Sequence, residues 1–444
     1  MKKRTFLKVS SSLLAAAPLT SFGDFALQDK LKNWAGNLIY STTNIQYPTS
    51  VEQVQSLVKK SDKIKALGSR HCFNNIADSK FAFIGMEKMN KVVSLDKTAG
   101  TVTIEGGMNY GQLCPYLETN GFALHNLASL PHISVTGACT TATHGSGIKN
   151  GNLSTSVRAL EFVVADGSLH RLNEKDDADK FMGAVVGLGA IGIITKITLA
   201  VQPSFTMRQY VFENLPLSEL SANFTKIMSA GHSVSLFTDW QKNSVNEVWV
   251  KLRSDEKFDG GSEFFGAKPA TKNVHPIIEL SAENCTEQMG VPGVWYERLP
   301  HFKMGFTPSS GKELQAEYFV PAKNAIDAMM AIQRMGKQIG PHLFISEIRT
   351  IASDKLWLSP ANNEDMVAIH FTWKQDWPDV SKLLPQIESE LAPYNVKPHW
   401  GKLFTLPKST LAAKYPAMQN FANLVKEYDP AGKFVNDFLK NNVL

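Results

Sequence analysis

The sequence predicts an α+β protein of two domains, and three observations lead to that fold class. The chain has 444 residues, more than a single hydrophobic core of ordinary size requires. Between Asn33 and Val201, short strand patterns alternate with short helix patterns. After Pro203 the sequence becomes rich in aromatic residues and polar loops. We therefore expect one domain over 33–203, a second over 204–396, and a C-terminal segment over 397–444 that returns to the first domain.

Composition and charge exclude several classes of protein. A hydrophobic content of 43% with 20% charged residues is typical of a globular protein. The 46 basic and 41 acidic residues are interspersed, and the net charge is +5. No basic block occurs beyond the extreme N-terminus, so nucleic acid is not an expected partner. No run of eighteen apolar residues is present, so no transmembrane segment is expected.

The first regular elements are expected near residue 50. Thr49 and Ser50 precede Glu52 and Gln53 at the spacing of a capping box, which marks the start of a helix. Apolar residues then recur at helical spacing at positions 51, 54, 57 and 58. Residues 64–67 form a short strand-like run, so we expect a helix followed by a strand.

The loop after this strand reads Gly68-Ser69-Arg70-His71-Cys72-Phe73-Asn74. A glycine followed by small and polar residues at the end of a strand turns backbone N–H groups inward, where they suit an anion such as a pyrophosphate. The imidazole of His71 is then expected beside the group that carries the pyrophosphate. From these seven residues alone, an ordinary turn with a surface histidine is an equal alternative.

The rest of the first domain is expected to continue as short strands and helices. Strand patterns occupy 92–95 and 101–104, a helix capped by Asn109 runs over 110–117, and 160–164 with 169–172 form a hairpin. A β-branched run over 191–201 predicts a buried strand.

The G-x-G-x-x-G at 187–192 is not a dinucleotide-binding fingerprint, because that motif needs a strand before it and a helix after it. Its glycines are expected to let the backbone approach a flat ligand or a neighbouring strand.

The second domain is expected to contain short strands over 214–321 and one long amphipathic helix over 322–339. Strand patterns at 344–349 and 368–373 then alternate polar with apolar residues. Residues two apart on a strand point the same way, so Glu347 shares a face with Arg349, and His370 with Thr372. Each pair is a candidate for lining a site, and a solvated strand face is the alternative.

Two further segments have the composition of a ligand-binding backbone. Residues 128–137 and 140–147 are mostly small or hydroxylated, as a chain needs to be where it passes close to a flat ring and a diphosphate. A threonine-rich loop is the alternative, but the ending His144-Gly145-Ser146-Gly147 is more specific. Near the C-terminus, Lys397-Pro398-His399-Trp400-Gly401-Lys402 is an uncommon combination of residue types.

Together these segments resemble, in order and over nearly the whole chain, the vanillyl-alcohol-oxidase family of FAD enzymes. The loop at 68–74 resembles the flavin-attachment loop of that family, in which a histidine often bonds to the 8α-methyl of the flavin. Arg70 and the runs at 75–78 and 129–132 are most similar to the alditol oxidases, a branch related to the aldonolactone oxidases. The resemblance implies FAD as the cofactor, attached covalently through His71.

The resemblance also implies domain roles and site residues. The first domain is expected to be an FAD-binding α+β domain of two subdomains, and the second a substrate or cap domain built on an antiparallel sheet. The implied cofactor-binding residues are Gly68, Ser69, Arg70, His71, Cys72, Phe73, Asn74, Ser129, Ser134, Gly137, Thr141, Thr143, His144, Gly145, Gly192, Ile193 and His399. The implied substrate-binding residues are Ser129, Glu347, Arg349, Thr372 and Lys402, and the implied catalytic residues are Glu347, Arg349, His370 and Lys402.

The chemistry implied is removal of a proton and a hydride from a carbinol. Flavin N5 takes the hydride, and negative charge gathers at the N1–C2=O edge, where a fixed cation lowers the barrier. By the resemblance, Lys402 and Arg349 supply that positive charge, while Glu347 and Thr372 bind hydroxyl groups. Either His370 or Lys402 accepts the proton, since burial and neighbouring cations lower the pKa of both.

The sequence departs from the family in two places. Some relatives attach the flavin through a histidine and a cysteine, but the matching second position here is Leu130, and Cys139 lies farther along, so a single attachment is expected. Ala128 lies where family members control oxygen access, and one small residue does not distinguish an oxidase from a dehydrogenase. The four cysteines (Cys72, Cys114, Cys139, Cys285) lie among apolar or small neighbours and are expected to be buried free thiols. A disulfide, which an oxidising periplasm permits, is the alternative, and the sequence does not pair the cysteines. The spacing of His125, His132 and His144 fits no metal site, so no metal is expected.

Three functions are open at this point. The first is FAD-dependent oxidation of a CH–OH group of a small polyol, such as xylitol or sorbitol, to the aldehyde, with O2 as the acceptor giving H2O2, or with another electron acceptor. The second is an aldono-1,4-lactone oxidase or dehydrogenase, which shares the flavin loop and the His-Trp-x-Lys motif. The third is a sugar-binding protein without catalysis, against which the full set of polar site residues argues.

Residues 1–23 have the pattern of an export signal. The basic stretch Lys2-Lys3-Arg4 precedes a short alanine-rich apolar run. The order Lys3-Arg4-Thr5-Phe6-Leu7-Lys8 resembles the twin-arginine signal, with lysine in place of the first arginine. That route carries folded proteins, which suits an enzyme that acquires its cofactor before export. We therefore expect a periplasmic protein, with an ordinary secretory signal or a disordered tail as the alternatives.

Overall fold

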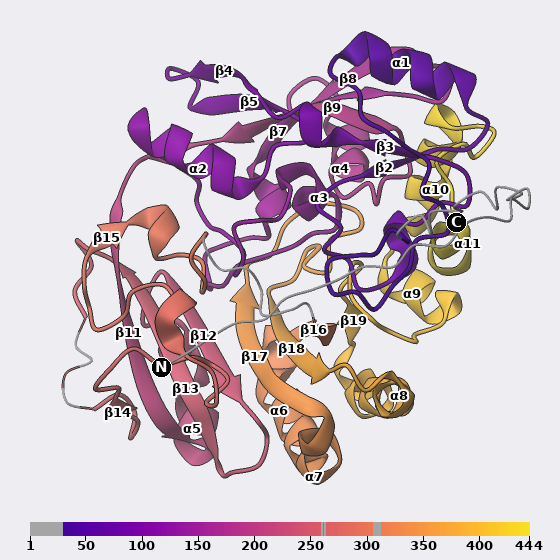
Figure 1. Ribbon diagram of the computed structural model, residues 1–444. Coiled ribbons are helices and arrows are strands. Elements are labelled where there is room, and N and C mark those ends of the chain that lie inside the picture. The colour runs from indigo at the N-terminus through magenta and orange to yellow at the C-terminus, as the bar shows by residue number, and fades with distance from the viewer. Residues whose placement is uncertain (1–29, 259–260, 262, 305–311) are drawn as a thin grey trace, which may run out of the picture. The chain divides into compact units, whose positions relative to one another are not determined.

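The computed structural model describes residues 30–258, 261, 263–304 and 312–444. The predicted export signal lies outside these residues. Leu31–Leu444 forms one compact unit in which helices surround antiparallel sheets and one small parallel sheet (Figure 1). The predicted α+β class is therefore confirmed. Among the described residues, no helix has the length and apolar character needed to cross a membrane.

The chain begins with a small parallel sheet that presents the loop at 68–74. Its strands are β1 (Ile45–Gln46), β3 (Phe83–Gly85) and β2 (Lys65–Leu67), in the order β1-β3-β2. Helix α1 (Val51–Lys60) starts as predicted, because the Ser50 side chain accepts a hydrogen bond from the Gln53 N–H. The Gln53 side chain accepts one in turn from the Thr49 N–H, at 2.8 Å. Short 3-10 turns, η1 (Asn75–Ala77) and η2 (Met86–Lys88), flank β3.

A five-stranded antiparallel sheet forms the rest of the N-terminal half. Its order is β4-β5-β9-β7-β8, with β4 at Val92–Asp96, β5 at Thr101–Glu105, β9 at Ile193–Ala200, β7 at Val157–Val163 and β8 at Leu169–Asn173. The predicted hairpin is confirmed as β7–β8. Around the sheet lie α2 (Tyr110–Thr119), α3 (Val135–Thr140), η3 (Leu153–Ser156), α4 (Ala178–Val185) and the short pair β6 (Phe122–Ala123) with β10 (Gln202–Pro203). The predicted cap of α2 is a complete capping box between Asn109 and Gln112.

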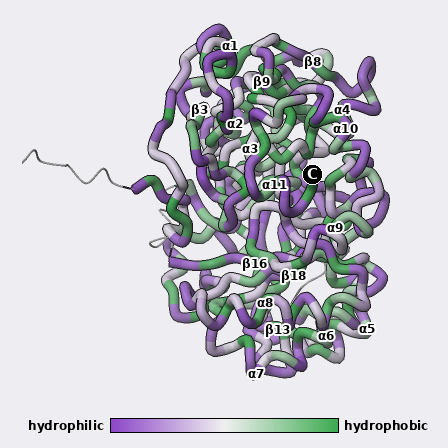
Figure 2. The backbone as a smooth tube through the Cα atoms, turned by 90° about the vertical axis from the view of Figure 1, so that its right-hand side faces the viewer, coloured by the Kyte–Doolittle hydropathy of each residue, from purple (hydrophilic) through white to green (hydrophobic). Residues whose placement is uncertain are grey.

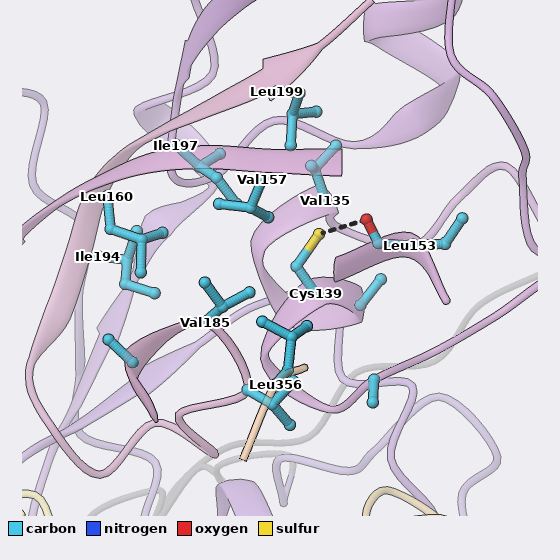
Figure 3. Close-up of a cluster of buried hydrophobic side chains, with 14 of the residues drawn as sticks. Val135, Cys139, Leu153, Val157, Leu160, Val185, Ile194, Ile197, Leu199 and Leu356 are labelled. Atoms are coloured by element: carbon cyan, nitrogen blue, oxygen red, sulfur yellow. Dashed lines mark hydrogen bonds between the residues drawn. The ribbon is translucent and has the colours of Figure 1, made fainter. Parts of the chain in front are cut away.

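The core of this half packs α3 against the sheet. Figure 3 shows Cys139 on α3 among apolar side chains of β7 and β9, with its thiol directed at the Leu153 carbonyl oxygen. Hydrophobic segments gather around α3 and β9 in the tube view, whereas hydrophilic residues follow the outer loops (Figure 2). All four cysteines are free, as predicted, and three of them are buried while Cys72 is half-buried.

The G-x-G-x-x-G segment lies between a helix and a strand, in the reverse of the dinucleotide-binding order. Helix α4 precedes it and β9 follows it, so its exclusion as a fingerprint is confirmed. Gly192 has φ 155°, and a Cβ there would lie 2.5 Å from the Val163 carbonyl oxygen. The glycine therefore lets this backbone lie against strand β7.

A nine-stranded antiparallel sheet forms the C-terminal half. Its order is β14-β11-β13-β12-β17-β18-β16-β19, and β15 pairs with β11. The strands are β11 (Thr206–Pro216), β12 (Ser233–Thr238), β13 (Ser244–Arg253), β14 (Lys268–Pro269), β15 (Gly293–Val294), β16 (Glu313–Pro321), β17 (Leu343–Ile351), β18 (Met366–Lys374) and β19 (Lys397–Pro398). The expectation of short strands over 214–321 was wrong for β13, which has ten residues. Its side chains are buried almost throughout, so a long run could form without exposing apolar surface.

The two faces of this sheet differ in character. One face carries apolar residues such as Leu236, Ile348 and Phe371, which pack against α5 (Leu217–Met228), α6 (Ala325–Arg334) and α8 (Trp377–Leu391). The alternation along each strand therefore directs Glu347, Arg349 and His370 to the opposite face.

The single helix expected over 322–339 was wrong. The segment is a 3-10 turn η6 (Ala322–Asn324), helix α6, and a short helix α7 (Gly336–Ile339) followed by η7 (Gly340–His342). The break falls where the loop after β12 packs against the helix. A Cβ at Gly336 would lie 2.1 Å from the Trp240 carbonyl oxygen, and the Gln241 side chain donates a hydrogen bond to the Gly336 carbonyl.

The C-terminal segment returns to the N-terminal half. After η8 (Ala392–Tyr394) come α9 (Lys408–Lys414), α10 (Met418–Tyr428) and α11 (Asp437–Asn442). Helix α10 contacts α4, and α11 contacts η1 (Figure 1). The turns η4 (Ala282–Asn284) and η5 (Trp295–Glu297) lie in the long connection between β14 and β16. The division at 203 and 396 stays a prediction, although β10 ends at Pro203 and β11 begins at Thr206.

Candidate active site

A cavity of about 330 Å³ lies between the polar face of the nine-stranded sheet and the loops of the N-terminal half. Predicted site residues from both halves line it: Gly68, Ser69, Arg70, His71, Cys72, Phe73, Ser129, Ser134, Gly137, Thr141, Thr143, His144, Gly192, Glu347, Arg349, His370, Thr372, His399 and Lys402. These residues are separated by up to several hundred positions in sequence. The fold therefore gathers the predicted catalytic, substrate-binding and most of the predicted cofactor-binding positions around one space.

Strand register explains how the charged residues meet. Glu347 on β17 pairs directly with His370 on β18, and His370 pairs with Glu317 on β16. Directly opposed residues on neighbouring strands have Cβ atoms about 5 Å apart. The three side chains therefore form one row across three strands, on the face that borders the cavity. His399, whose N–H donates to the Glu317 carbonyl oxygen at 2.9 Å, extends the row.

Glu317 is the centre of the charged cluster, and sequence reasoning missed it. Its side chain is 1% exposed and bonds to Arg349 Nη2 at 2.8 Å and to Lys402 Nζ at 2.7 Å. His144 Nε2 lies 3.3 Å from the same carboxylate. Burial alone raises the pKa of Glu317, but Lys402, His144 and Arg349 outweigh burial and hold the pKa well below its usual value. Glu317 is therefore an ionised, fully paired carboxylate.

Lys402, His370 and Thr372 form a hydrogen-bonded chain. Lys402 Nζ lies 2.8 Å from His370 Nδ1, and His370 Nε2 lies 3.0 Å from Thr372 Oγ1. Burial and the nearby Lys402 hold the pKa of His370 well below its usual value, so the imidazole is neutral. Burial also lowers the pKa of Lys402, and Glu317 opposes that shift. Both ring nitrogens of His370 are thus already engaged by side chains of the site.

Glu347 and Arg349 hold the other side of the cluster. Glu347 Oε1 accepts a hydrogen bond from His301 Nε2 at 2.7 Å and lies 3.5 Å from Arg349 Nε. Burial opposes ionisation, yet Arg349 and His301 lower the pKa of Glu347 strongly. Arg349 Nη1 also lies 3.4 Å from Ser129 Oγ, which links the sheet to the loop at 128–137. Among the described residues, Glu347 Oε2 has no hydrogen-bond partner, so this oxygen is available to a ligand.

The loop at 68–74 has the conformation expected of an anion nest. Arg70 has φ 61°, in the left-handed region that non-glycine residues rarely adopt. Within the described part of the chain, no acceptor is bonded to the N–H groups of Ser69, Arg70 or His71. A run of free N–H groups around a left-handed residue is suited to a phosphate.

His71 itself is held in place with one ring nitrogen left over. Its Nδ1 donates to the Ser69 carbonyl oxygen at 3.0 Å, and its ring stacks on Trp34 with centroids 5.1 Å apart. Nε2 is buried without a hydrogen-bond partner among the described residues. Burial lowers the pKa of His71 to about 4, so the imidazole is neutral and retains a lone pair.

Comparisons with known proteins decide the family. The chain is 43% identical to alditol oxidase of a Streptomyces species, over 92% of this chain and 98% of that protein. It belongs to the alditol oxidase family. It is also 26% identical to L-gulono-1,4-lactone dehydrogenase of Mycobacterium tuberculosis, over 92% of this chain and 97% of that protein.

Family models and a solved structure agree with this placement. Residues 43–173 match the model of an FAD binding domain, and residues 307–442 match that of D-arabinono-1,4-lactone oxidase. Cholesterol oxidase from B. sterolicum has the same fold, with a TM-score of 0.76 over 97% of this chain and all of that one, at 14% identity. The alditol oxidase relative and the FAD-binding domain make this chain an FAD-dependent oxidoreductase, as the sequence motifs predicted.

The residues around the cavity fit FAD. In this family member the free N–H groups at 69–71 and the unpartnered, buried His71 nitrogen face one space. Ser69 Oγ accepts a hydrogen bond from the Ser134 N–H at 3.0 Å, which ties the two loops of the wall together. A Cβ on Gly68 or Gly137 would come within 2.7 Å or 2.6 Å of Ser134 Oγ. Residues 68–73 and 134–143 would therefore hold a diphosphate and a flat ring along glycine backbone.

Three predicted cofactor positions of the alditol oxidase family lie outside the cavity lining. Asn74 instead donates its side-chain amide to the carbonyl oxygens of Trp400 and Lys402, at 2.8 and 2.6 Å, and so anchors the Lys402 segment. Gly145 packs against the Leu127 carbonyl oxygen, where a Cβ would lie at 2.4 Å. The Ile193 side chain packs in a separate apolar cluster. Because side chains alternate along the strand, the neighbouring Ile194 lines the cavity instead.

Other predicted positions are placed as follows. Leu130 and Ala128 both line the cavity, so the residue at the second attachment position faces the same space as His71. His132 Nε2 bonds to the Met304 carbonyl oxygen at 2.8 Å, and His144 belongs to the Glu317 cluster. Sequence reasoning missed Glu317 and His301. Glu317 could have been found from the sequence, because Glu313, Gln315 and Glu317 alternate with apolar residues in a strand pattern. All three line the cavity. His301 lies in a loop, and no sequence pattern marks it as a site residue.

Proposed function

We propose that this chain oxidises the CH–OH group of a small polyol to the aldehyde. Bound FAD supplies the hydride acceptor. The observation that supports the proposal most is the convergence of Glu347, Arg349, Thr372 and Lys402 on the cavity that the His71 loop also lines. The relative at 43% identity over most of the chain, named alditol oxidase, supports the same substrate class.

The residues of the sheet suit a neutral, polyhydroxylated substrate. Two buried carboxylates, Glu317 and Glu347, balance the two buried cations Arg349 and Lys402. A site with balanced charge gives no net attraction to an ionised substrate. Glu347 Oε2 accepts a substrate hydroxyl proton in a hydrogen bond, and Ser129 and Thr372 offer hydroxyl groups that both donate and accept.

The proton of the substrate hydroxyl is relayed into the Lys402–His370 pair while Lys402 is uncharged. Thr372 Oγ1 accepts it and passes its own proton to His370 Nε2, and His370 Nδ1–H passes a proton to Lys402 Nζ, which becomes the ammonium. The two groups are 2.8 Å apart and buried, so they titrate as one unit. His370 is neutral, and Thr372 Oγ1 connects it to the cavity. Arg349, paired with two carboxylates, stays charged because its pKa is raised by Glu347 and Glu317 despite burial. It therefore supplies the fixed positive charge that stabilises negative charge as it develops.

A lactone substrate is the alternative. The match of residues 307–442 to the D-arabinono-1,4-lactone oxidase model favours it. An assay that compares xylitol or sorbitol with an aldono-1,4-lactone, at equal concentration, separates the two. Turnover of the lactone alone would reject the polyol proposal. Peroxide formation measured against reduction of an artificial acceptor, in the same assay, tests O2 as the acceptor.

We further propose that FAD is bound covalently through His71. The neutral ring and its unpartnered nitrogen support this. Forming the bond to the 8α-methyl removes two electrons and two protons, which an acceptor such as O2 must take up. Acid-precipitated protein should stay yellow, and a peptide containing His71 should gain the mass of FAD. Release of all flavin into the acid supernatant would contradict the bond.

Export to the periplasm is likewise proposed, from the basic and apolar pattern of residues 1–23. Cell fractionation tests it. Mature protein without these residues should appear outside the cytoplasm, and full-length protein confined to the cytosol would reject the proposal.

A further inference from the structure

We propose that Lys251 and His301 act together as positioning residues for Glu347, by fixing the carboxylate that binds a substrate hydroxyl. This inference rests on the proposed function, because it concerns how the same site holds its substrate. Neither residue belongs to a motif, and they come from β13 and from the loop after η5. The contacts that carry the proposal run in a line from Lys251 through His301 to Glu347.

The first link is the Lys251 ammonium. Lys251 is 1% exposed, and its Nζ lies 2.6 Å from the Leu299 carbonyl oxygen, 2.8 Å from that of Pro300 and 3.2 Å from His301 Nδ1. An ammonium has three donors and no acceptor. Its three hydrogens are therefore all directed at these atoms, and the third leaves Nδ1 of His301 as an acceptor.

The second link is the tautomer of His301. With Nδ1 accepting, the ring proton is on Nε2, which lies 2.7 Å from Glu347 Oε1 and donates to it. If the proton moves from Lys251 to His301, Nε2 still carries a hydrogen. Both placements of that proton thus leave a donor aimed at the carboxylate, and the charged form of Lys251 excludes the tautomer in which a lone pair would face Glu347. Burial lowers the pKa of Lys251 to about 7, and the neighbouring Glu347 carboxylate opposes that shift and so favours the charged form.

The third link is the orientation of the ring. The edges of Phe237 and Trp249 pack against His301, with centroids 5.4 and 5.2 Å away and planes 71° and 83° apart. The His301 N–H donates to the Ser129 carbonyl oxygen at 3.2 Å. His301 is therefore fixed to the sheet and to the loop at 128–137, and cannot follow Glu347 if the carboxylate turns.

The consequence concerns which carboxylate oxygen meets the substrate. His301 occupies Oε1, while Oε2 has no partner among the described residues and Glu347 borders the cavity. Without His301, Glu347 is free to rotate toward Arg349, whose Nε is 3.5 Å from Oε1 and lacks a hydrogen-bond partner within the described part of the chain. Lys251 and His301 thus keep one oxygen directed at a substrate hydroxyl.

A double-mutant cycle tests this. His301→Leu, Glu347→Gln and the double variant are compared in holoenzyme by anaerobic stopped-flow, in which the dependence of the flavin-reduction rate on xylitol concentration gives Kd. We expect His301→Leu to raise Kd roughly ten- to a hundredfold, the range for a hydrogen bond to a charged group. In the Glu347→Gln background the same change should add less than twofold. Equal effects in both backgrounds would overturn the proposal, because the residues would then act independently.

Matched variants separate positioning from folding. His301→Gln keeps an N–H near the place of Nε2 and should recover most of the affinity, whereas His301→Asn is too short and should not. Lys251→Met should shift Kd in the same direction as His301→Leu. His232→Leu is the control, since His232 Nε2 bonds to the His125 carbonyl oxygen at 3.1 Å and His232 is not part of the cavity lining. Equal Kd values for the Gln and Asn variants would contradict the proposal even if the Leu variant does not fold.

Failure of the proposed function is distinguishable from failure of this inference. If the wild type turns over only a 1,4-lactone, the polyol proposal is wrong, and the cycle is then measured with the lactone. Coupling between His301 and Glu347 in the cycle measured with the lactone still supports the inference that His301 positions Glu347. Wild-type turnover of xylitol without coupling rejects the link alone.

Discussion

The cavity has two walls that present different chemistry to a ligand. The sheet wall comes from β16, β17 and β18 together with Lys402, and the loop wall comes from residues 68–74, 128–144 and 188–192. The sheet wall presents charged side chains that already bond to one another, with Glu317 bonded to both Arg349 and Lys402. The loop wall presents glycine backbone, free N–H groups and small side chains. A substrate therefore meets a fixed electrostatic field on one side, while a cofactor meets shape and backbone donors on the other.

Because of this difference, the two walls should respond differently to mutation. Charges buried together are costly to separate, since removing one partner leaves the other unpaired in a low-dielectric interior. Substitution of a glycine on the loop wall acts through steric overlap. The cost is small where the added Cβ meets a side chain that can move, and large where it meets backbone that cannot. Single substitutions on each wall test whether the two walls act independently.

The largest effect is expected at Glu317. Glu317→Gln leaves Arg349 and Lys402 without their shared carboxylate, so the free energy of unfolding should fall by about 3–5 kcal/mol. The matched control is Glu247→Gln, another buried carboxylate on the nine-stranded sheet, whose pKa burial raises to about 7. Its Oε2 accepts from Trp249 Nε1 at 2.7 Å, which an amide oxygen also does, so the loss should stay near 1 kcal/mol or less. Chemical denaturation of both variants measures the difference.

The lowered pKa of Glu317 predicts that the stability of the protein depends on pH. Because the pKa of Glu317 is lower in the folded protein than its ordinary value of 4.5, the unfolded chain binds more protons at acid pH. The stabilisation is therefore complete above about pH 4.5 and is lost as the pH falls toward the folded value. Melting temperatures between pH 3 and 7 should fall less steeply for Glu317→Gln than for the wild type. Parallel curves would show that Glu317 is not ionised in the folded state.

The next effect is expected at Lys402, and it is kinetic. Lys402→Met removes one charged donor near the reacting centre, so flavin reduction by a polyol should slow roughly a hundredfold to a thousandfold. The loop wall is untouched, and FAD content should match the wild type. Lys374→Met, at an exposed lysine bonded to the Pro341 carbonyl oxygen, is the control. Anaerobic stopped-flow measures both, and unchanged kinetics for Lys402→Met would remove this residue from the site.

On the loop wall, the largest effect is expected at Gly192. A Cβ there would lie 2.5 Å from the Val163 carbonyl oxygen at a φ of 155°, so Gly192→Ala should cost about 2–4 kcal/mol of stability and reduce FAD retention. Gly137→Ala is the comparison, because its Cβ meets Ser134 Oγ, the end of a side chain that rotates. The second variant should therefore contain more FAD per protein after purification, as measured from the ratio of flavin to protein absorbance. The reverse order would show that backbone contact does not govern this wall.

The two walls also differ in how far the sequence predicts them. Each segment of the loop wall is continuous in sequence, so Gly68–Asn74 and Ser129–His144 could be recognised as motifs. Most of their residues line the cavity. The sheet wall depends on register between strands far apart in the chain. Glu347 and Arg349 were found because they alternate on one strand, but the ion pair of Arg349 with Glu317 arises because β18 pairs with both β17 and β16. No local pattern specifies such pairing.

The same reasoning accounts for the errors in the fold. The helix at 322–339 had continuous helical periodicity, yet a distant loop at Trp240 breaks it at Gly336. Ile193 was predicted at the cofactor, but a one-residue difference in strand phase turns it to the opposite face. Element type followed from the sequence, whereas the contacts between elements required the fold.

The smallest effect is expected at Ser129, where the walls meet. Its hydroxyl lies 3.4 Å from Arg349 Nη1, a long contact, and Arg349 keeps its 2.8 Å bond to Glu317 without it. Ser129→Ala should therefore cost about 1 kcal/mol in substrate binding, roughly a fivefold rise in KM, with little change in the limiting rate of flavin reduction. Steady-state and anaerobic kinetics with one polyol measure both quantities. A large fall in the reduction rate would mean that Arg349 depends on the loop for its position, and the two walls would then act as one unit.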